Sequence, residues 1–151
     1  MKNYYLVCAG AVKWAHPEWR GRFYPEDLPD DWMLSYYNTH FQAVYLPAKD
    51  WQSATQSTWA EWLHETQESF VFLLEPGGSP AGLPSSDRVR LALPDWAEEH
   101  LWWIDDNFDL RALGRRITSR AATGETLFVI SRSGDLQKLQ AVNELRQVMG
   151  Y

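Results

Sequence analysis

Trp14-Ala-His-Pro-Glu-Trp-Arg-Gly-Arg-Phe-Tyr-Pro25 is the stretch that decides the fold, and it follows closely on an apolar run at residues 4–12. Its mixture of aromatic rings, arginines, prolines and glycine suits neither a helix nor a strand. Pro17 and Pro25 move the residues before them away from helical angles, and Gly21 permits a turn. We therefore expect a long, structured loop that leaves the end of a strand. In an α/β protein, loops of this kind lie at the edge where ligands bind.

Around this loop the sequence alternates between strand and helix patterns. Strands are expected at residues 4–12, 42–46, 70–74, 89–93 and 126–130, with amphipathic helices ending near residues 41, 66, 123 and 149. The order of strand, helix and strand favours right-handed parallel crossovers. Residues 76–84 are rich in glycine and proline and form a loop, whereas residues 95–108 fit either a short strand or a packed loop.

Capping signals place the ends of the helices. Residues 53–58 offer several possible N-caps, and Thr58-x-x-Glu61 has the spacing of a capping box. Asp109 and Asp135 can each cap a helix, and Gly124 stands just past the end of one.

The loop and the next helix also resemble the opening of a known family. Trp14, Trp19-Arg-Gly, Phe23-Tyr-Pro and Leu28-Pro, followed by a helix with Tyr36-Tyr37, are similar to the start of the YecE-like family, the domain of unknown function numbered 72. A second block, residues 88–150, is similar to the family's last strands and helices. The resemblance implies a TIM-barrel-like fold and no settled biochemical activity.

A full eight-stranded barrel takes about 250 residues, and this chain has 151. We therefore expect a shortened, divergent member: an α/β protein with a reduced TIM-barrel-like parallel β/α fold, about five strands, and one partial-barrel domain over residues 1–151. The middle of the barrel would be missing near residues 76–84.

The chain departs from the family pattern at strand ends that face the barrel mouth. Gly10-Ala-Val-Lys-Trp14 stands where the family has Gly-Thr-Ser-Gly-Trp, and Val44-Tyr-Leu-Pro47 replaces a Glu-x-Asn pattern. Glu75 replaces a lysine, Ala92-Leu93 replaces His-Gly, and Ser131-Arg132 replaces paired asparagines. Chemistry in this fold is done by side chains at these positions. We therefore expect a protein without a catalytic site, acting as a small-ligand-binding or protein-interaction module.

Composition narrows the class of protein further. A hydrophobic content of 45% allows one sizeable core. The 14 basic and 20 acidic residues give a net charge of −6, which disfavours nucleic acid as a partner.

Cys8 is the only cysteine, which excludes an internal disulfide and suits a buried thiol in a reducing compartment. No apolar run approaches the roughly 18 residues of a membrane span, and the start lacks a signal-peptide plan. We expect a soluble cytoplasmic protein.

The loop supplies the best binding candidates. The guanidinium groups of Arg20 and Arg22 can hold a carboxylate or phosphate, and the neighbouring rings offer stacking faces for a sugar or base. Alternatively, Arg20 ties down the loop through backbone carbonyls or an acid such as Asp27. The predicted ligand-binding residues are Trp14, His16, Trp19, Arg20, Arg22 and Tyr24.

An enzyme is the alternative reading. A hydrolase or isomerase acting on a small anionic or sugar-like substrate would hold it with Arg20 and Arg22. His16, paired with Glu18, or Asp50 or Glu75 would move protons. The four histidines and one cysteine lack metal-ligand spacing, and no phosphate-loop, dinucleotide or nucleophile-elbow motif occurs. We therefore expect no metal and no cofactor.

A partial barrel leaves sheet edges uncovered. Loops or a second copy of the chain must cover them, so a homodimer is expected.

Overall fold

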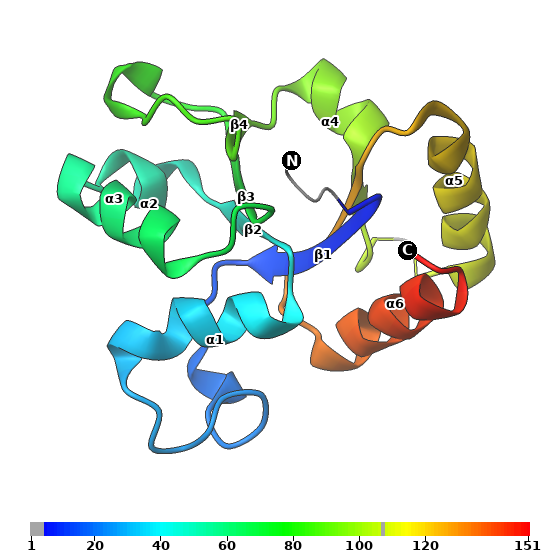
Figure 1. The fold of residues 1–151 in the computed structure, drawn as a ribbon, viewed down its shortest axis with the longest axis horizontal. Helices are drawn as coiled ribbons and strands as arrows, with labels where there is room; N and C mark the ends of the chain where they lie inside the picture. The colour runs from blue at the N-terminus through cyan, green and yellow to red at the C-terminus, as the bar shows by residue number, and fades with distance from the viewer. Residues whose placement is uncertain (1–4, 107) are drawn as a thin grey trace.

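The strands of this protein form one curled sheet with helices outside its curve (Figure 1). The structure is a computed structural model and describes residues 5–106 and 108–151. The strands are β1 Val7–Val12, β2 Ala43–Leu46, β3 Val71–Leu74, β4 Val89–Leu91, β5 Leu101–Trp103 and β6 Leu127–Ser131. The α-helices are α1 Met33–His40, α2 Ala48–Gln52, α3 Gln56–Glu65, α4 Pro94–His100, α5 Leu110–Thr123 and α6 Leu136–Val148. Short 3₁₀ turns occupy Pro17–Trp19, Asp30–Trp32 and Pro80–Gly82.

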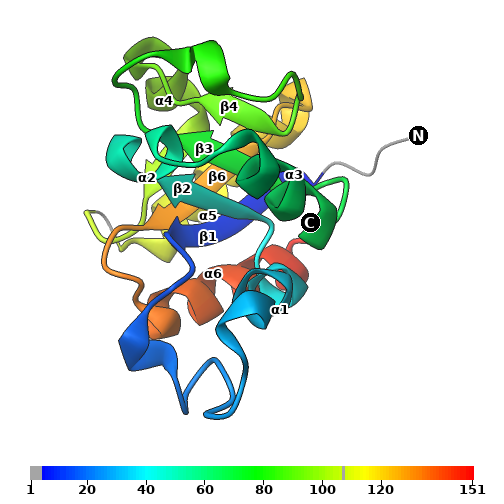
Figure 2. The same cartoon turned by 90° about the vertical axis from the view of Figure 1, so that its left-hand side faces the viewer.

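The sheet has the order β4-β3-β2-β1-β6-β5, and every neighbouring pair is parallel. β4, β3, β2 and β1 follow one below another in the side view (Figure 2). In the sheet, β1 is paired with β2 on one side and β6 on the other. β3 pairs directly with β4 across the glycine- and proline-rich loop, with Phe72 opposite Val89. The curled parallel sheet with outer helices confirms the predicted TIM-barrel-like β/α fold as a half-barrel.

The sheet has six strands, so the expected number of five was wrong. The additional strand is β5, in the segment that the sequence left undecided between strand and loop. That segment also holds α4, and Asn107 lies outside the described residues. β5 has only three residues and follows α4 without a linker. The alternation of apolar and polar residues that indicates a strand needs a longer segment than this.

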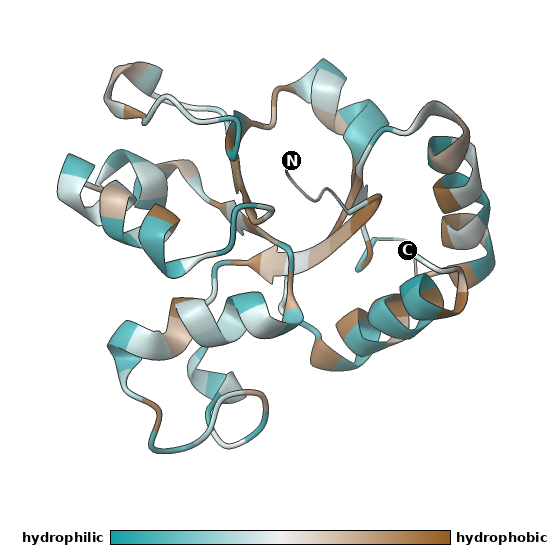
Figure 3. Cartoon of the chain, viewed as in Figure 1, coloured by the Kyte–Doolittle hydropathy of each residue, from teal (hydrophilic) through white to brown (hydrophobic). Residues whose placement is uncertain are grey.

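The outer face of the sheet carries the larger part of the core. Side chains that alternate along the strands, such as Val7, Ala9 and Val129, pack against the helices and are fully buried. Figure 3 shows the same division, with hydrophobic strands in the interior and hydrophilic stretches on the outer helices. This is the pattern expected where both faces of a parallel sheet are covered.

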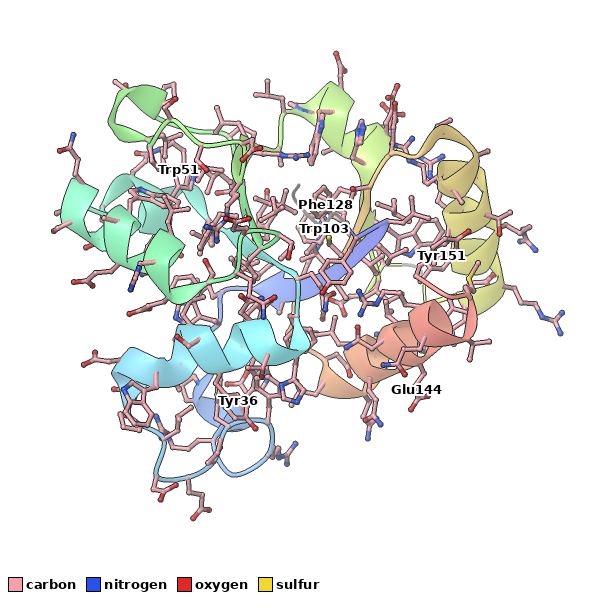
Figure 4. All side chains as sticks on the ribbon, in the orientation of Figure 1. Tyr36, Trp51, Trp103, Phe128, Glu144 and Tyr151 are labelled. Atoms are coloured by element: carbon pink, nitrogen blue, oxygen red, sulfur yellow. The ribbon has the colours of Figure 1, made fainter. Side chains whose placement is uncertain are left out.

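The inner face of the sheet forms a second, smaller core. Trp103 and Phe128 lie inside the curve in Figure 4. Tyr45 and Leu73 belong to the same hydrophobic cluster. Helix α4 covers this face, with the ring of Trp96 5.7 Å from that of Phe128. α4 thus closes the concave side that further strands would close in a complete barrel.

Most predicted caps are present. Asp109 accepts hydrogen bonds from Arg111 N and Ala112 N, Asp135 accepts one from Lys138 N, and Gly124 ends α5 with a φ of 72°. Of the possible N-caps at residues 53–58, the structure uses Thr55 and not the capping-box position Thr58. Thr55 is the N-cap of α3, and its hydroxyl accepts a hydrogen bond from Thr58 N.

Candidate functional site

The parallel strands bring the segments that follow them to one edge of the sheet. Lys13 follows β1, Glu75 follows β3 and Arg132 follows β6. In folds of this type, the carboxyl edge is where ligands bind. The predicted site residues should therefore lie at this edge if they form a site.

The loop at residues 14–25 is packed against the helix layer by its aromatic residues. Trp19 is 1% exposed, stacks on His16 with ring centroids 4.1 Å apart, and donates from its indole nitrogen to Gly134 O at 3.0 Å. Tyr24 is equally buried, and its hydroxyl donates to Trp14 O at 2.5 Å. Burial raises the pKa of the Tyr24 phenol well above its usual value. Both side chains belong to the framework that shapes the loop.

The two arginines of the loop have different surroundings. The Arg20 guanidinium donates to the carbonyl oxygens of Glu26 and Leu28, each at 2.9 Å, and to the carboxylate of Asp30 at 2.8 Å. This is the loop-tying arrangement considered from the sequence, with Asp30 as the acid in place of Asp27. Arg22 is exposed and lines a separate pocket beside α1 and α6.

His16 is held by its own loop. Its Nε2 lies 2.8 Å from Val12 O and 3.0 Å from Lys13 O, so this nitrogen carries the proton and donates to these carbonyls. Its Nδ1 lies 3.5 Å from Glu18 Oε1. The imidazole thus fixes the backbone at the end of β1.

A cleft of about 230 Å³ opens at the ends of β1 and β2. Its walls are Trp14 and Trp62, whose rings meet edge to face at 5.1 Å, together with Lys13, Ala15, Leu46 and Asp50. The Lys13 ammonium lies 3.6 Å from Asp50 Oδ2, too far for a hydrogen bond. Within residues 5–106 and 108–151, that buried carboxylate oxygen has no hydrogen-bond donor.

The backbone at Lys13 is strained. Lys13 has a φ of +65°, in the left-handed region that disfavours side chains with a Cβ by about 1–2 kcal/mol. Its amide donates to Tyr45 O at 2.9 Å, and its carbonyl accepts from His16. These contacts hold the conformation in place. In the family pattern a glycine, which adopts this conformation freely, stands at the corresponding position.

Asp50 and Glu75 are both located at helix α2, which follows the end of strand β2. Asp50 lies within α2, and Glu75 Oε1 accepts a hydrogen bond from Ala48 N, the first residue of that helix, at 3.1 Å. Glu75 therefore stabilises the start of α2, while Asp50 faces the cleft.

A second polar cluster at the barrel mouth was missed. The Arg132 guanidinium lies 3.6 Å from the centre of the Trp103 ring, and that ring meets Tyr45 edge to face at 5.0 Å. Burial raises the pKa of Tyr45, Glu75 raises it further, and Arg132 opposes them. The adjacent Trp102 and Trp103 were a signal, because neighbouring tryptophans in a strand face opposite sides. The place of Arg132 at a strand end was another.

The part of the chain that the structure describes contains neither a cluster of metal-ligating side chains nor a helix able to cross a membrane. In the ranges 5–106 and 108–151, no three side chains of His, Cys, Asp or Glu are grouped as metal ligands. Over the same described part of the chain, none of the helices has the length and apolar character needed to cross a bilayer.

The six parallel strands and the helices that flank them define a TIM-barrel-like β/α half-barrel. Residues 8–76 match the profile of the family described as protein of unknown function DUF72, which confirms the YecE-like resemblance over that segment. Over this segment the chain is thus similar to the DUF72 family. The match ends at residue 76, so the second block of resemblance, residues 88–150, stays a prediction.

A solved structure of a DUF72 family protein from Thermotoga maritima is similar to this chain. The TM-score is 0.42 at 17% sequence identity, over 83% of this chain and 43% of that one. This chain therefore spans less than half the length of that protein. A comparison with curated proteins gave no match.

Proposed function

We propose that this protein binds a small sugar-like ligand in the cleft between Lys13, Trp14, Asp50 and Trp62. The observation that carries the proposal is the buried Asp50 oxygen without a hydrogen-bond donor, beside a lysine and two tryptophan rings. A ligand hydroxyl can donate to the carboxylate and accept from the ammonium, while a sugar ring packs on indole.

Charge balance favours a neutral ligand over a strongly anionic one. The carboxylate of Asp50 offsets the positive charge of Lys13, and the chain carries a net charge of −6. The cleft volume of about 230 Å³ lies below the usual range for drug-sized ligands, about 300–1,000 Å³. Both features favour a compact polyhydroxyl molecule.

Strain at Lys13 supports the same proposal. A left-handed conformation at a residue other than glycine persists where the surrounding structure imposes it, and such residues concentrate at functional sites. Lysine at this position lowers stability but supplies the only side chain seen to pair with Asp50 among the described residues.

Replacing Lys13 by glycine is expected to separate binding from stability. The Lys13→Gly variant should gain about 1 kcal/mol of unfolding free energy, because glycine relieves the left-handed strain. It should also bind a monosaccharide at least about tenfold more weakly, since the charged partner of Asp50 is lost. Urea unfolding measures the first effect, and tryptophan fluorescence titration with glucose, galactose and glucosamine measures the second.

The matched control is Lys49→Gly, at an exposed position within helix α2. It should lose about 1 kcal/mol, because glycine disfavours a helix, and should leave binding unchanged. If none of the sugars binds the unsubstituted protein, or if Lys13→Gly binds them equally well, the cleft is not a sugar site.

We also propose a homodimer. The outermost strands β4 and β5 each have a neighbour on one side only, as expected for a partial barrel. Light scattering over a range of concentrations should give twice the 17.6 kDa of the chain. A monomer at the highest concentration would exclude the dimer.

A further inference from the structure

A pocket of about 440 Å³ lies between the loop at residues 14–25, the end of α1 and the first half of α6. Its apolar walls are Phe23, Phe41 and Leu136, and its polar groups include Arg22, His40 and Asn143. None of these residues lines the cleft at Lys13. The pocket is therefore a separate site.

Two polar side chains of this pocket, those of Asn143 and Arg22, have groups without a partner among the described residues. Asn143 Oδ1 is buried and, within the described part of the chain, receives no hydrogen bond. No contact that the structure describes pairs the Arg22 guanidinium with an acid or a carbonyl, whereas that of Arg20, two residues earlier, makes three hydrogen bonds. A buried acceptor without a donor costs about 1–3 kcal/mol. A ligand or a water molecule would supply the donor that Asn143 Oδ1 lacks.

His40 adds a further polar group to the same pocket. Its Nδ1 lies 2.7 Å from the Thr39 hydroxyl, and its ring packs against Phe23 and Tyr36 with centroids 5.0 and 5.5 Å apart. These contacts fix the plane of the imidazole. They leave Nε2 as the ring nitrogen available to a ligand.

We propose that this pocket binds a small carboxylate that also carries an N–H donor and an apolar side chain, as in an N-acylated amino acid. The carboxylate pairs with Arg22, whose planar fork suits two oxygen atoms. The N–H donates to Asn143 Oδ1, and the side chain packs against Phe23, Phe41 and Leu136. The three parts of the ligand thus correspond to the three kinds of group that the pocket offers.

The test uses N-acetyl-L-phenylalanine, followed by calorimetry and by NMR of backbone amides. Saturable binding in the millimolar range is expected, with the largest shifts at the amides of Phe23, Phe41 and Asn143. Two analogues of the probe separate the contributions of its carboxylate and its N–H to binding, without a change to the protein. N-acetyl-L-phenylalanine amide lacks the carboxylate and 3-phenylpropionate lacks the N–H, so each should bind at least about fivefold more weakly.

The variant Arg22→Gln should weaken binding of N-acetyl-L-phenylalanine at least about tenfold. Its fold should be unaffected, because the Arg22 side chain is exposed and has no described polar contact, and the backbone hydrogen bond from Arg22 N to Trp19 O is kept in the variant. The control Arg115→Gln changes an exposed arginine on α5 and should bind like the unsubstituted protein. The proposal is overturned by the absence of saturable binding up to about 10 mM, or by equal affinity of the acid and its amide.

Discussion

Replacing Gly10 by alanine is expected to prevent stable folding. Gly10 lies at the centre of the sheet, opposite Ala43 on β2 and Ile130 on β6. A Cβ there would stand 1.8 Å from Ala43 O and 2.7 Å from the hydroxyl oxygen of Tyr37. The first of these atoms belongs to a strand backbone and cannot move aside without breaking the sheet.

The Tyr37 hydroxyl increases the cost of this substitution. It donates to Ala43 O and accepts from Ala11 N, each at 2.7 Å, so one buried group bridges β1 and β2. Displacing it would leave both backbone groups without a partner. The loss of unfolding free energy in Gly10→Ala should exceed about 4 kcal/mol, as measured by urea unfolding.

Gly114→Ala is the matched control for this experiment. Gly114 lies within α5, and apart from its chain neighbours and the backbone of its own helix, no atom is within 4 Å of the place where a Cβ would stand. Alanine there should be neutral or should stabilise the protein by up to about 1 kcal/mol. If Gly10→Ala unfolded at nearly the same urea concentration as Gly114→Ala, the packing described between β1 and β2 would be incorrect.

Trp19→Ala should have the second largest effect, a loss of about 3–5 kcal/mol. The ring of Trp19 is buried against His16, Tyr37 and Phe41, and its indole nitrogen bonds to Gly134, just before α6. Its removal would leave a cavity and release the loop from α6. Thermal and urea unfolding should both show the change.

Trp32→Ala provides the comparison, because Trp32 is 63% exposed. This substitution should change stability by no more than about 0.5 kcal/mol. Equal effects of the two substitutions would contradict the central role of Trp19 in fixing the loop.

The fold could be predicted where the hydrophobic pattern was long enough. β1 and β6 are continuous apolar runs at the centre of a parallel sheet, and Asp135 marks the start of α6 by a local hydrogen bond. α4 and β5 were not identified, because ten residues contain a helix and a strand with no turn between them. The sequence offered several N-caps at residues 53–58, and only the structure identifies Thr55 as the one that caps α3.

The candidate site was predictable only in its location. The sequence indicated the loop after β1. The role of each side chain in that loop depends on the direction in which it points, and the tertiary structure sets that direction. Arg20 turns back to its own loop, while Arg22 faces a pocket. The left-handed backbone of Lys13 carries no local signal, since lysine does not favour it. Tyr45, Trp103 and Arg132 meet only because β2, β5 and β6 curl toward one another.

The brevity of the outermost strands has a consequence for self-association. β4 and β5 have three residues each, whereas β1 has six. Edge strands this short offer few unpaired amide and carbonyl groups to another chain. Open-ended strand pairing between copies, which would form fibrils, is therefore disfavoured. Contact between copies of this protein would accordingly depend on side-chain surfaces and stop at a finite assembly.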